Sequence, residues 1–183
     1  MTFKLETERL ILTVPSMQDY DNLLSLRTDP VVMASASNEG SEFGSGKPQA
    51  PEQVKEHIEL AQGYFDEYGL CFFCVFEKST GNFIGQAGLF HWCYKLDQPD
   101  IELAYRLFEK YWDKGYGTEL AKALIKWGLN DRKLPRIIAP VHPDNIRSVN
   151  VLKKAGMKFD GKINHKGVIL NNYVIKNEEK NSL

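Results

Sequence analysis

The segment from Ile101 to Leu124 constrains the fold of this chain more than any other stretch. Its first residues, 101–108, are mostly apolar and predict a β-strand, which a short polar loop with a Gly115-x-Gly117 step follows. From about 118 to 129, apolar residues recur at helical spacing and predict an amphipathic helix. A strand that leads through glycines into a helix is typical of an α/β protein.

Apolar runs and breakers predict the other elements. The expected strands span 9–14, 70–76, 83–90, 136–141, 157–163 and 168–175, and the expected helices begin at Ser16, Pro51 and Asn145. The helix after Ser16 has Met17, Tyr20, Leu23 and Leu24 as its expected apolar stripe. Lys78–Asn82 is a turn that predicts an antiparallel hairpin, and residues 34–50 predict a polar loop. The element order predicts a mixed sheet with helices on its faces.

Length and charge narrow the class of protein. A chain of 183 residues predicts a single domain spanning 1–183. Its net charge of -1, with 23 basic against 24 acidic residues, disfavours nucleic acid as the main partner. No apolar run approaches the roughly 20 residues that span a membrane. The three cysteines and an N-terminus without an apolar signal core predict a cytoplasmic location.

The glycine step suggests an anion site. Gly115 and Gly117 allow backbone to approach a ligand closely, and the N–H groups that open the next helix attract negative charge. The segment lacks the spacing of a nucleotide-triphosphate loop and the third glycine of a dinucleotide fingerprint. By itself, it fits a pyrophosphate cradle and an unliganded tight turn equally well.

A second segment has ligand-binding potential. Asn145 stands where a helix should start, and Ser148 lies on the same helical face, so both side chains can address a ligand in a neighbouring cleft. Simple capping by Asn145 with a solvated serine is the alternative, and it is favoured when this segment is taken alone.

Together the two segments resemble the GNAT superfamily of acetyltransferases. Trp112-Asp-Lys-Gly-Tyr-Gly117 is similar to the loop that binds the pyrophosphate of coenzyme A, although many members carry Gln or Arg in place of Trp112. Asn145-x-x-Ser148 is similar to a second CoA-contacting helix, and Glu6–Leu12 resembles the start of RimJ/RimL-like ribosomal-protein N-terminal acetyltransferases. The CoA contacts that the resemblance implies are Leu107, Trp112, Asp113, Lys114, Gly115, Tyr116, Gly117, Thr118, Asn145 and Ser148.

The resemblance also implies a fold and an activity. The fold would be a mostly antiparallel sheet of about seven strands, splayed at a central parallel pair, with the pantetheine arm in the gap between the strands that end at Phe108 and start at Arg136. The activity would be acetyl transfer from acetyl-CoA to a protein N-terminal α-amine or a small amine by direct attack, without a metal. A thioester oxygen would meet a backbone N–H of the strand 101–108. Exposed sheet edges in this fold often pair into homodimers.

Two residues are candidates for proton transfer. Glu102 is the first candidate for the base because other family members place a carboxylate there; a surface ion pair is nearly as good an explanation. Many members use a tyrosine seven residues after the helix asparagine to stabilise the leaving thiolate, but Leu152 holds that position here. Ser148 is therefore assigned this role.

Other residues suggest weaker alternatives. Cys71 and Cys74 favour core packing over a redox pair, and Cys93 lacks a histidine–acid partner nearby in sequence. His91 and His142 are reserve bases, and the four histidines give no zinc pattern. Glu39 and Glu42 could attract a cation, although a solvated linker is favoured. Competing functions are a non-catalytic acyl-CoA-binding module and, less favoured, a nucleotide-binding protein.

Overall fold

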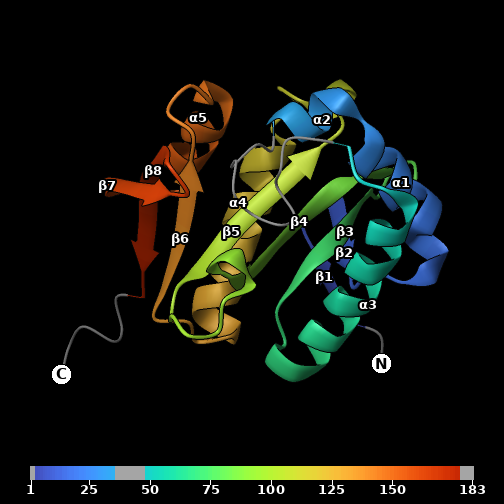
Figure 1. Ribbon diagram of the computed structural model, residues 1–183, viewed down its shortest axis with the longest axis horizontal. Helices are drawn as coiled ribbons and strands as arrows, with labels where there is room; N and C mark the ends of the chain where they lie inside the picture. The colour runs from blue at the N-terminus through green and yellow to red at the C-terminus, as the bar shows by residue number, and fades with distance from the viewer. Residues whose placement is uncertain (1–2, 36–47, 178–183) are drawn as a thin grey trace.

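The computed structural model describes residues 3–35 and 48–177. A single sheet contains all eight described strands, in the order β1-β2-β3-β4-β5-β6-β8-β7 (Figure 1). The strands are β1 Lys4–Glu6, β2 Leu10–Thr13, β3 Cys71–Glu77, β4 Phe83–His91, β5 Ile101–Leu107, β6 Arg136–Val141, β7 Lys158–His165 and β8 Val168–Lys176. The α-helices are α1 Tyr20–Thr28, α2 Pro30–Ser35, α3 Pro51–Tyr68, α4 Tyr116–Lys126 and α5 Ile146–Lys154.

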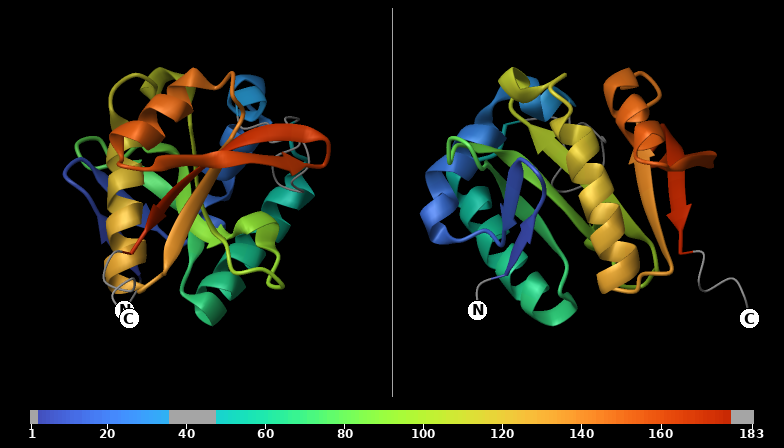
Figure 2. Two further views of the ribbon diagram at one scale, coloured as in Figure 1. Left: turned by 90° about the vertical axis from the view of Figure 1, so that its left-hand side faces the viewer. Right: turned by 180° about the vertical axis from the view of Figure 1, so that it is seen from behind.

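The sheet divides at its centre. β5 and β6 run parallel and share one bridging pair, Glu102 with Ile138, whereas every other neighbouring pair of strands is antiparallel. Beyond Glu102 the two strands diverge toward the end that carries α5 (Figures 1 and 2). The expected mixed, mostly antiparallel sheet with a central parallel pair is confirmed, including the hairpin of β3 and β4.

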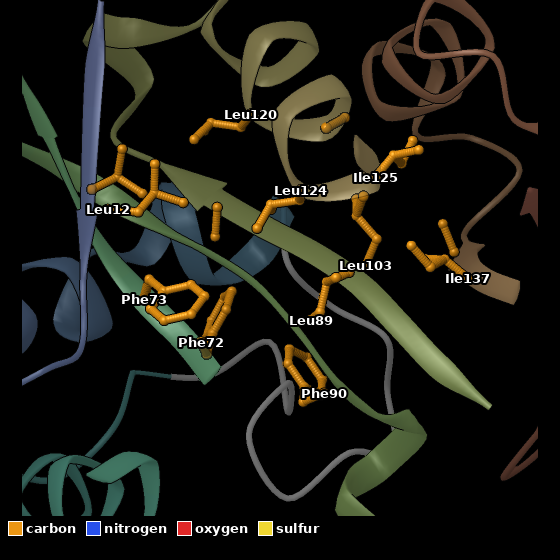
Figure 3. Close-up of a cluster of buried hydrophobic side chains, with 14 of the residues drawn as sticks. Leu12, Phe72, Phe73, Leu89, Phe90, Leu103, Leu120, Leu124, Ile125 and Ile137 are labelled. Carbon is orange, nitrogen blue, oxygen red and sulfur yellow. The ribbon is translucent and has the colours of Figure 1, made fainter. Parts of the chain in front are cut away.

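Helices cover both faces of the sheet. α1 and α3 pack on β3 and β4, and α4 lies on the opposite face over β4 and β5 (Figure 2). Leu120 and Leu124 project from α4 toward the sheet, into the same core as Leu103, and neither α4 leucine is exposed (Figure 3). Burying such a side chain contributes about 1.5–3 kcal/mol, so this interface holds α4 against the sheet.

Some expected elements differ from the structure. β1 is an additional strand, and its short polar sequence gave no alternating signal. Met17 does not join the buried stripe, since it is 52% exposed in a 3-10 turn before α1. α2 occupies the start of the expected loop; residues 36–47, with Glu39 and Glu42, lie outside the described residues. No helix in the described ranges is long and apolar enough to cross a membrane.

Candidate active site

A cavity of about 730 Å³ occupies the gap between β5 and β6. It is lined from one side by β5 and the loop that leads into α4, and from the other side by β6 and the start of α5. Because β5 pairs with β6 at Glu102 alone, the backbone of residues 103–107 has no β6 strand partner along the gap. The expected gap between the two strands is therefore present as a cavity, and the edge of β5 that borders it is not paired with β6.

The glycine loop is built for close backbone approach. Gly115 adopts a left-handed conformation with φ of 82°, and Asp113 does so with φ of 57°. α4 begins at Tyr116, so its first N–H groups have no intrahelical acceptors and lie beside the cavity. A Cβ atom added to Gly117 would stand 3.5 Å from the ring of Tyr105 and 3.4 Å from Val151. A helix N-terminus of this kind, facing the gap, has the geometry that suits an anion.

Some residues of the loop line the cavity and others do not. Trp112, Asp113, Gly115, Gly117, Thr118 and Leu107 line the cavity. Trp112 donates its indole N–H to the Leu107 carbonyl at 2.8 Å, which anchors the loop to the end of β5. Lys114 and Tyr116 do not line the cavity; the Tyr116 ring lies under Arg9, at 4.3 Å, and its hydroxyl donates to Glu77. These two residues can serve a ligand through backbone groups.

A basic side chain stands at the rim of the cavity. The Arg147 guanidinium lies 5.0 Å from the Trp112 ring centroid, and its Nε is 3.5 Å from the Asp113 carboxylate. Arg147 belongs to α5, whereas Trp112 and Asp113 belong to the loop before α4. The two halves of the split sheet therefore meet at a cation that could accompany a diphosphate.

Asn145 and Ser148 lie together at the start of α5. The Asn145 Oδ1 accepts a hydrogen bond from the Ser148 backbone N–H at 3.1 Å, so Asn145 caps the helix. Both residues also line the cavity. Asn145 therefore both caps α5 and lines the cavity, two roles that the sequence presented as alternatives.

Tyr105 is a site residue that the sequence analysis missed. Its hydroxyl is buried in the cavity wall and has no hydrogen bond of good geometry among the described residues. Burial raises the pKa of Tyr105 to about 12, and the nearby Ser148 hydroxyl opposes this rise. Tyr105 and Ser148 approach from opposite sides of the gap, β5 and α5. In the sequence, Tyr105 resembles the other residues of its apolar strand, and no local signal marks it.

Glu102 is buried in the cavity wall and is not a surface ion-pair residue. Its side chain is 8% exposed, and burial raises its pKa to about 8. Two smaller effects oppose that rise, the positive charge of Arg106 and a hydrogen bond from the Cys93 backbone. Glu102 also stands opposite Phe90 in the β4–β5 register, at the point where β5 and β6 separate. A carboxyl group of this kind can take up a proton near neutral pH.

The structure places Cys93 and the two reserve histidines. Cys93, which has no histidine–acid partner nearby in sequence, lies in the cavity wall with its Sγ 3.7 Å from the His165 Nε2. Burial raises the pKa of Cys93 to about 11, so its thiol is not an activated nucleophile. His142 lines the cavity, but His91 does not: its Nδ1 is hydrogen-bonded to the Tyr64 hydroxyl of α3.

The other two cysteines belong to the hydrophobic core. Cys71 and Cys74 are buried in two different apolar clusters, which confirms core packing. Within residues 3–35 and 48–177, no group of three or more His, Cys, Asp or Glu side chains could hold a metal ion.

Comparisons with known proteins identify the family to which the chain belongs. Residues 9–158 match the sequence profile of a family described as "Acetyltransferase (GNAT) domain". The chain is 29% identical to YkkB of Bacillus subtilis over 157 residues, covering 85% of this chain and 86% of YkkB. An acetyltransferase structure from Agrobacterium tumefaciens superposes with a TM-score of 0.74 at 26% identity, covering 96% of this chain and 95% of that one.

More distant solved structures share the fold alone. The ribosomal L7/L12 α-N-protein acetyltransferase RimL, solved with coenzyme A, has a TM-score of 0.78 at 12% identity and covers 95% of this chain and 98% of its own. The enzyme AAC(6')-Ib, solved with paromomycin and acetyl-CoA, has a TM-score of 0.73 at 16% identity, with coverage of 96% and 97%. The profile match spans most of the sequence, and the chain belongs to the GNAT family of acetyltransferases.

Proposed function

We propose that this protein is an acetyl-CoA-dependent N-acetyltransferase that acts as a single domain and acetylates a primary amine by direct attack. The observation that carries the proposal is the position of Glu102, a buried carboxyl group in the cavity where β5 and β6 part, next to the free edge of β5. A non-catalytic acyl-CoA binder would have no need for such a group. The free cysteines Cys71 and Cys74 accord with a cytoplasmic location.

The cavity offers partners for the pyrophosphate and the pantetheine arm of acetyl-CoA. The N–H groups at the start of α4 and the Arg147 guanidinium would hold the pyrophosphate, with Asp113, Gly115 and Gly117 giving the backbone its close approach. The free edge of β5, between Leu103 and Leu107, would pair with the pantetheine amides as an added strand does. Bound in this way, acetyl-CoA supplies the activated acetyl group.

Glu102 would act as the general base. The amine nitrogen forms a bond to the thioester carbonyl carbon, and the proton that the nitrogen loses passes to the Glu102 carboxylate, directly or through water. An α-amine has a pKa of about 8. Burial also raises the pKa of Glu102 to about 8, so its carboxylate is a stronger base than an ordinary carboxylate. A backbone N–H of β5 would receive the carbonyl oxygen as negative charge grows on it.

Ser148 and Tyr105 would act on the leaving group. As the carbon–sulfur bond breaks, its electron pair stays on sulfur, and the Ser148 hydroxyl would donate a hydrogen bond to the thiolate. The Tyr105 hydroxyl lies opposite Ser148 across the cavity. This hydroxyl is buried, and it makes no hydrogen bond of good geometry to any described residue. We therefore assign Tyr105 the task of orienting the Ser148 hydroxyl, a role that replaces the helix tyrosine whose position Leu152 occupies.

A screen of acetyl-CoA consumption tests the function. Purified protein is supplied with acetyl-CoA and a panel of peptide N-termini and small amines, and thiol release is followed. The resemblance to the RimJ/RimL-like branch favours an acceptor α-amine. We also expect CoA to raise the melting temperature, while ATP does so weakly or not at all, because the native state alone binds the ligand. Stabilisation by CoA with no turnover of any amine would favour the non-catalytic alternative.

A further inference from the structure

A strained turn stands at one end of the cavity. Cys93 and Tyr94 follow each other in the left-handed region, with φ of 57° and 54°, although neither is a glycine. Each such residue costs roughly 1–2 kcal/mol relative to a right-handed conformation. Strain of this kind persists where surrounding contacts enforce it, and it concentrates at functional sites. The turn directs Trp92, Cys93 and Tyr94 together to the cavity wall.

The strained turn completes an aromatic enclosure. Phe90 and Tyr94 stack with ring centroids 4.7 Å apart and an interplanar angle of 4°, and Phe72 meets Phe90 edge-on at 5.5 Å. Trp92 contacts the His165 ring at 5.3 Å, across the gap from the end of β7. We call the four residues Phe72, Phe90, Trp92 and Tyr94, all of which line the cavity, its aromatic end.

The aromatic end is positioned beside the proposed base. Phe90 is the β4 partner of Glu102 in the β4–β5 register, and directly paired residues project from the same face of a sheet. The Cys93 backbone N–H also hydrogen-bonds to the Glu102 carboxyl group. A molecule held among these rings would therefore present its amine to Glu102, on the face opposite α4.

Guanidinium groups lie behind the rings. The Arg106 guanidinium lies 5.1 Å from the Phe72 ring centroid and lines the cavity. Arg27 is fully buried behind it, donating to Gln49 at 2.6 Å and to Gln86 at 3.0 Å. The charge of Arg106 also acts on the Glu102 carboxyl group, so this wall combines aromatic rings with groups of both charges.

From this arrangement we infer that the aromatic end is the acceptor subsite, and that it selects an amine carried on a flat apolar body over an amine on an aliphatic chain. The inference rests on the proposed acetyl transfer and specifies its acceptor. The rings would bury the body of the acceptor, and Glu102 would receive the ammonium proton.

Three amines separate these possibilities. We expect 2-phenylethylamine to be acetylated with a kcat/KM about tenfold or more above that of n-butylamine, since pocket contacts of this size are worth at least that factor. Spermidine, which carries no ring, should also be a poorer acceptor than 2-phenylethylamine. Trp92→Ala should lower kcat/KM for 2-phenylethylamine by a larger factor than kcat/KM for n-butylamine. Phe159→Ala is the matched control, because this ring is 55% exposed and outside the cavity.

A binding measurement keeps this inference separate from the proposed activity. Calorimetric titration of 2-phenylethylamine and n-butylamine into the CoA-saturated protein should show the same preference and the same loss in Trp92→Ala. Selective binding without turnover would refute the acetyltransferase proposal and support the subsite. A preference for spermidine, or an equal effect of Trp92→Ala on both monoamines, would refute the subsite.

Discussion

Arg9 and Glu119 join the second strand to the first turn of α4, with the Arg9 Nε 2.7 Å from the Glu119 Oε2. The Arg9 backbone N–H donates to the same carboxylate at 2.8 Å, and its guanidinium also donates to the Lys114 carbonyl at 3.1 Å. The Thr7 hydroxyl completes the contact by donating to Glu119 at 2.5 Å. The N-terminal residues that resemble the RimJ/RimL-like branch thus hold the glycine loop in place.

Removal of the Arg9 side chain tests this role. We expect Arg9→Ala to raise the KM for acetyl-CoA about fivefold, as for the loss of about 1 kcal/mol, while kcat changes little. The reason is that the loop loses an anchor and no reacting group is lost. Arg132→Ala is the control, since Arg132 also donates to a backbone carbonyl, but to that of Tyr68 at the end of α3 and not to one in the glycine loop. Equal effects of the two substitutions on KM would contradict the proposed role.

The glycine loop gives a second prediction. Gly117→Glu should abolish CoA binding in a folded protein, because its side chain would bring bulk and negative charge between Tyr105 and Val151. Gly115→Ala should act differently: φ is 82°, while the nearest atom to the new Cβ is 3.5 Å away. It should therefore lower the free energy of unfolding by about 1 kcal/mol through backbone strain. Calorimetry with CoA and thermal unfolding measure the two effects; normal CoA binding by Gly117→Glu would place the phosphates elsewhere.

Burial of Glu102 predicts a pH-dependent stability. Burial raises the pKa of this carboxyl from its ordinary value of 4.5 to about 8, so between these values the folded state holds a proton that the unfolded state releases. Stability from this group therefore falls as pH increases from about 4.5 to about 8. Glu102→Gln removes the titration, and its melting temperature relative to wild type should increase across that window. A constant difference in melting temperature between about pH 4.5 and about pH 9 would contradict the raised pKa.

The same titration should appear in the rate. The ratio of kcat/KM for wild type to that for Glu102→Gln cancels the ionisation of the acceptor amine itself. This ratio should increase with pH and level off above about 8, because the wild type gains its carboxylate base only as Glu102 loses its proton. A ratio near one at every pH would leave deprotonation to solvent or to another group such as His142.

Local patterns carried enough information for most of the architecture. The apolar run of β3, the turn at Lys78–Asn82 and the apolar run of β4 predicted a hairpin that the register confirms. The helix α3 was also predictable at both ends, from Pro51 at its start and from Gly69, whose φ is 62°, at its end. These signals act between residues that are close in sequence, where propensity and turn chemistry suffice.

Features that depend on distant residues were not predictable. Cys93 and His165 are 72 positions apart, and their contact exists because the β7–β8 hairpin reaches the turn after β4. Burial of Glu102 also depends on residues that are distant in sequence, because the sequence of a strand alone does not reveal what covers its end. Tyr105 resembled any apolar strand residue until α5 placed Ser148 opposite its hydroxyl.

The pairing of Tyr105 with Ser148 gives the last prediction. CoA and desulfo-CoA differ only in the thiol group, so the ratio of the dissociation constant of desulfo-CoA to that of CoA reports contacts to sulfur. If Ser148 contacts sulfur and Tyr105 orients it, Tyr105→Phe and Ser148→Ala should each reduce this ratio and lower kcat, and the double variant should resemble Ser148→Ala alone. A net contribution of roughly 1 kcal/mol, about fivefold, is expected for one such hydrogen bond. Additive effects of the two substitutions would show that Tyr105 acts independently of Ser148, and an unchanged ratio in Tyr105→Phe would assign its hydroxyl a purely structural role.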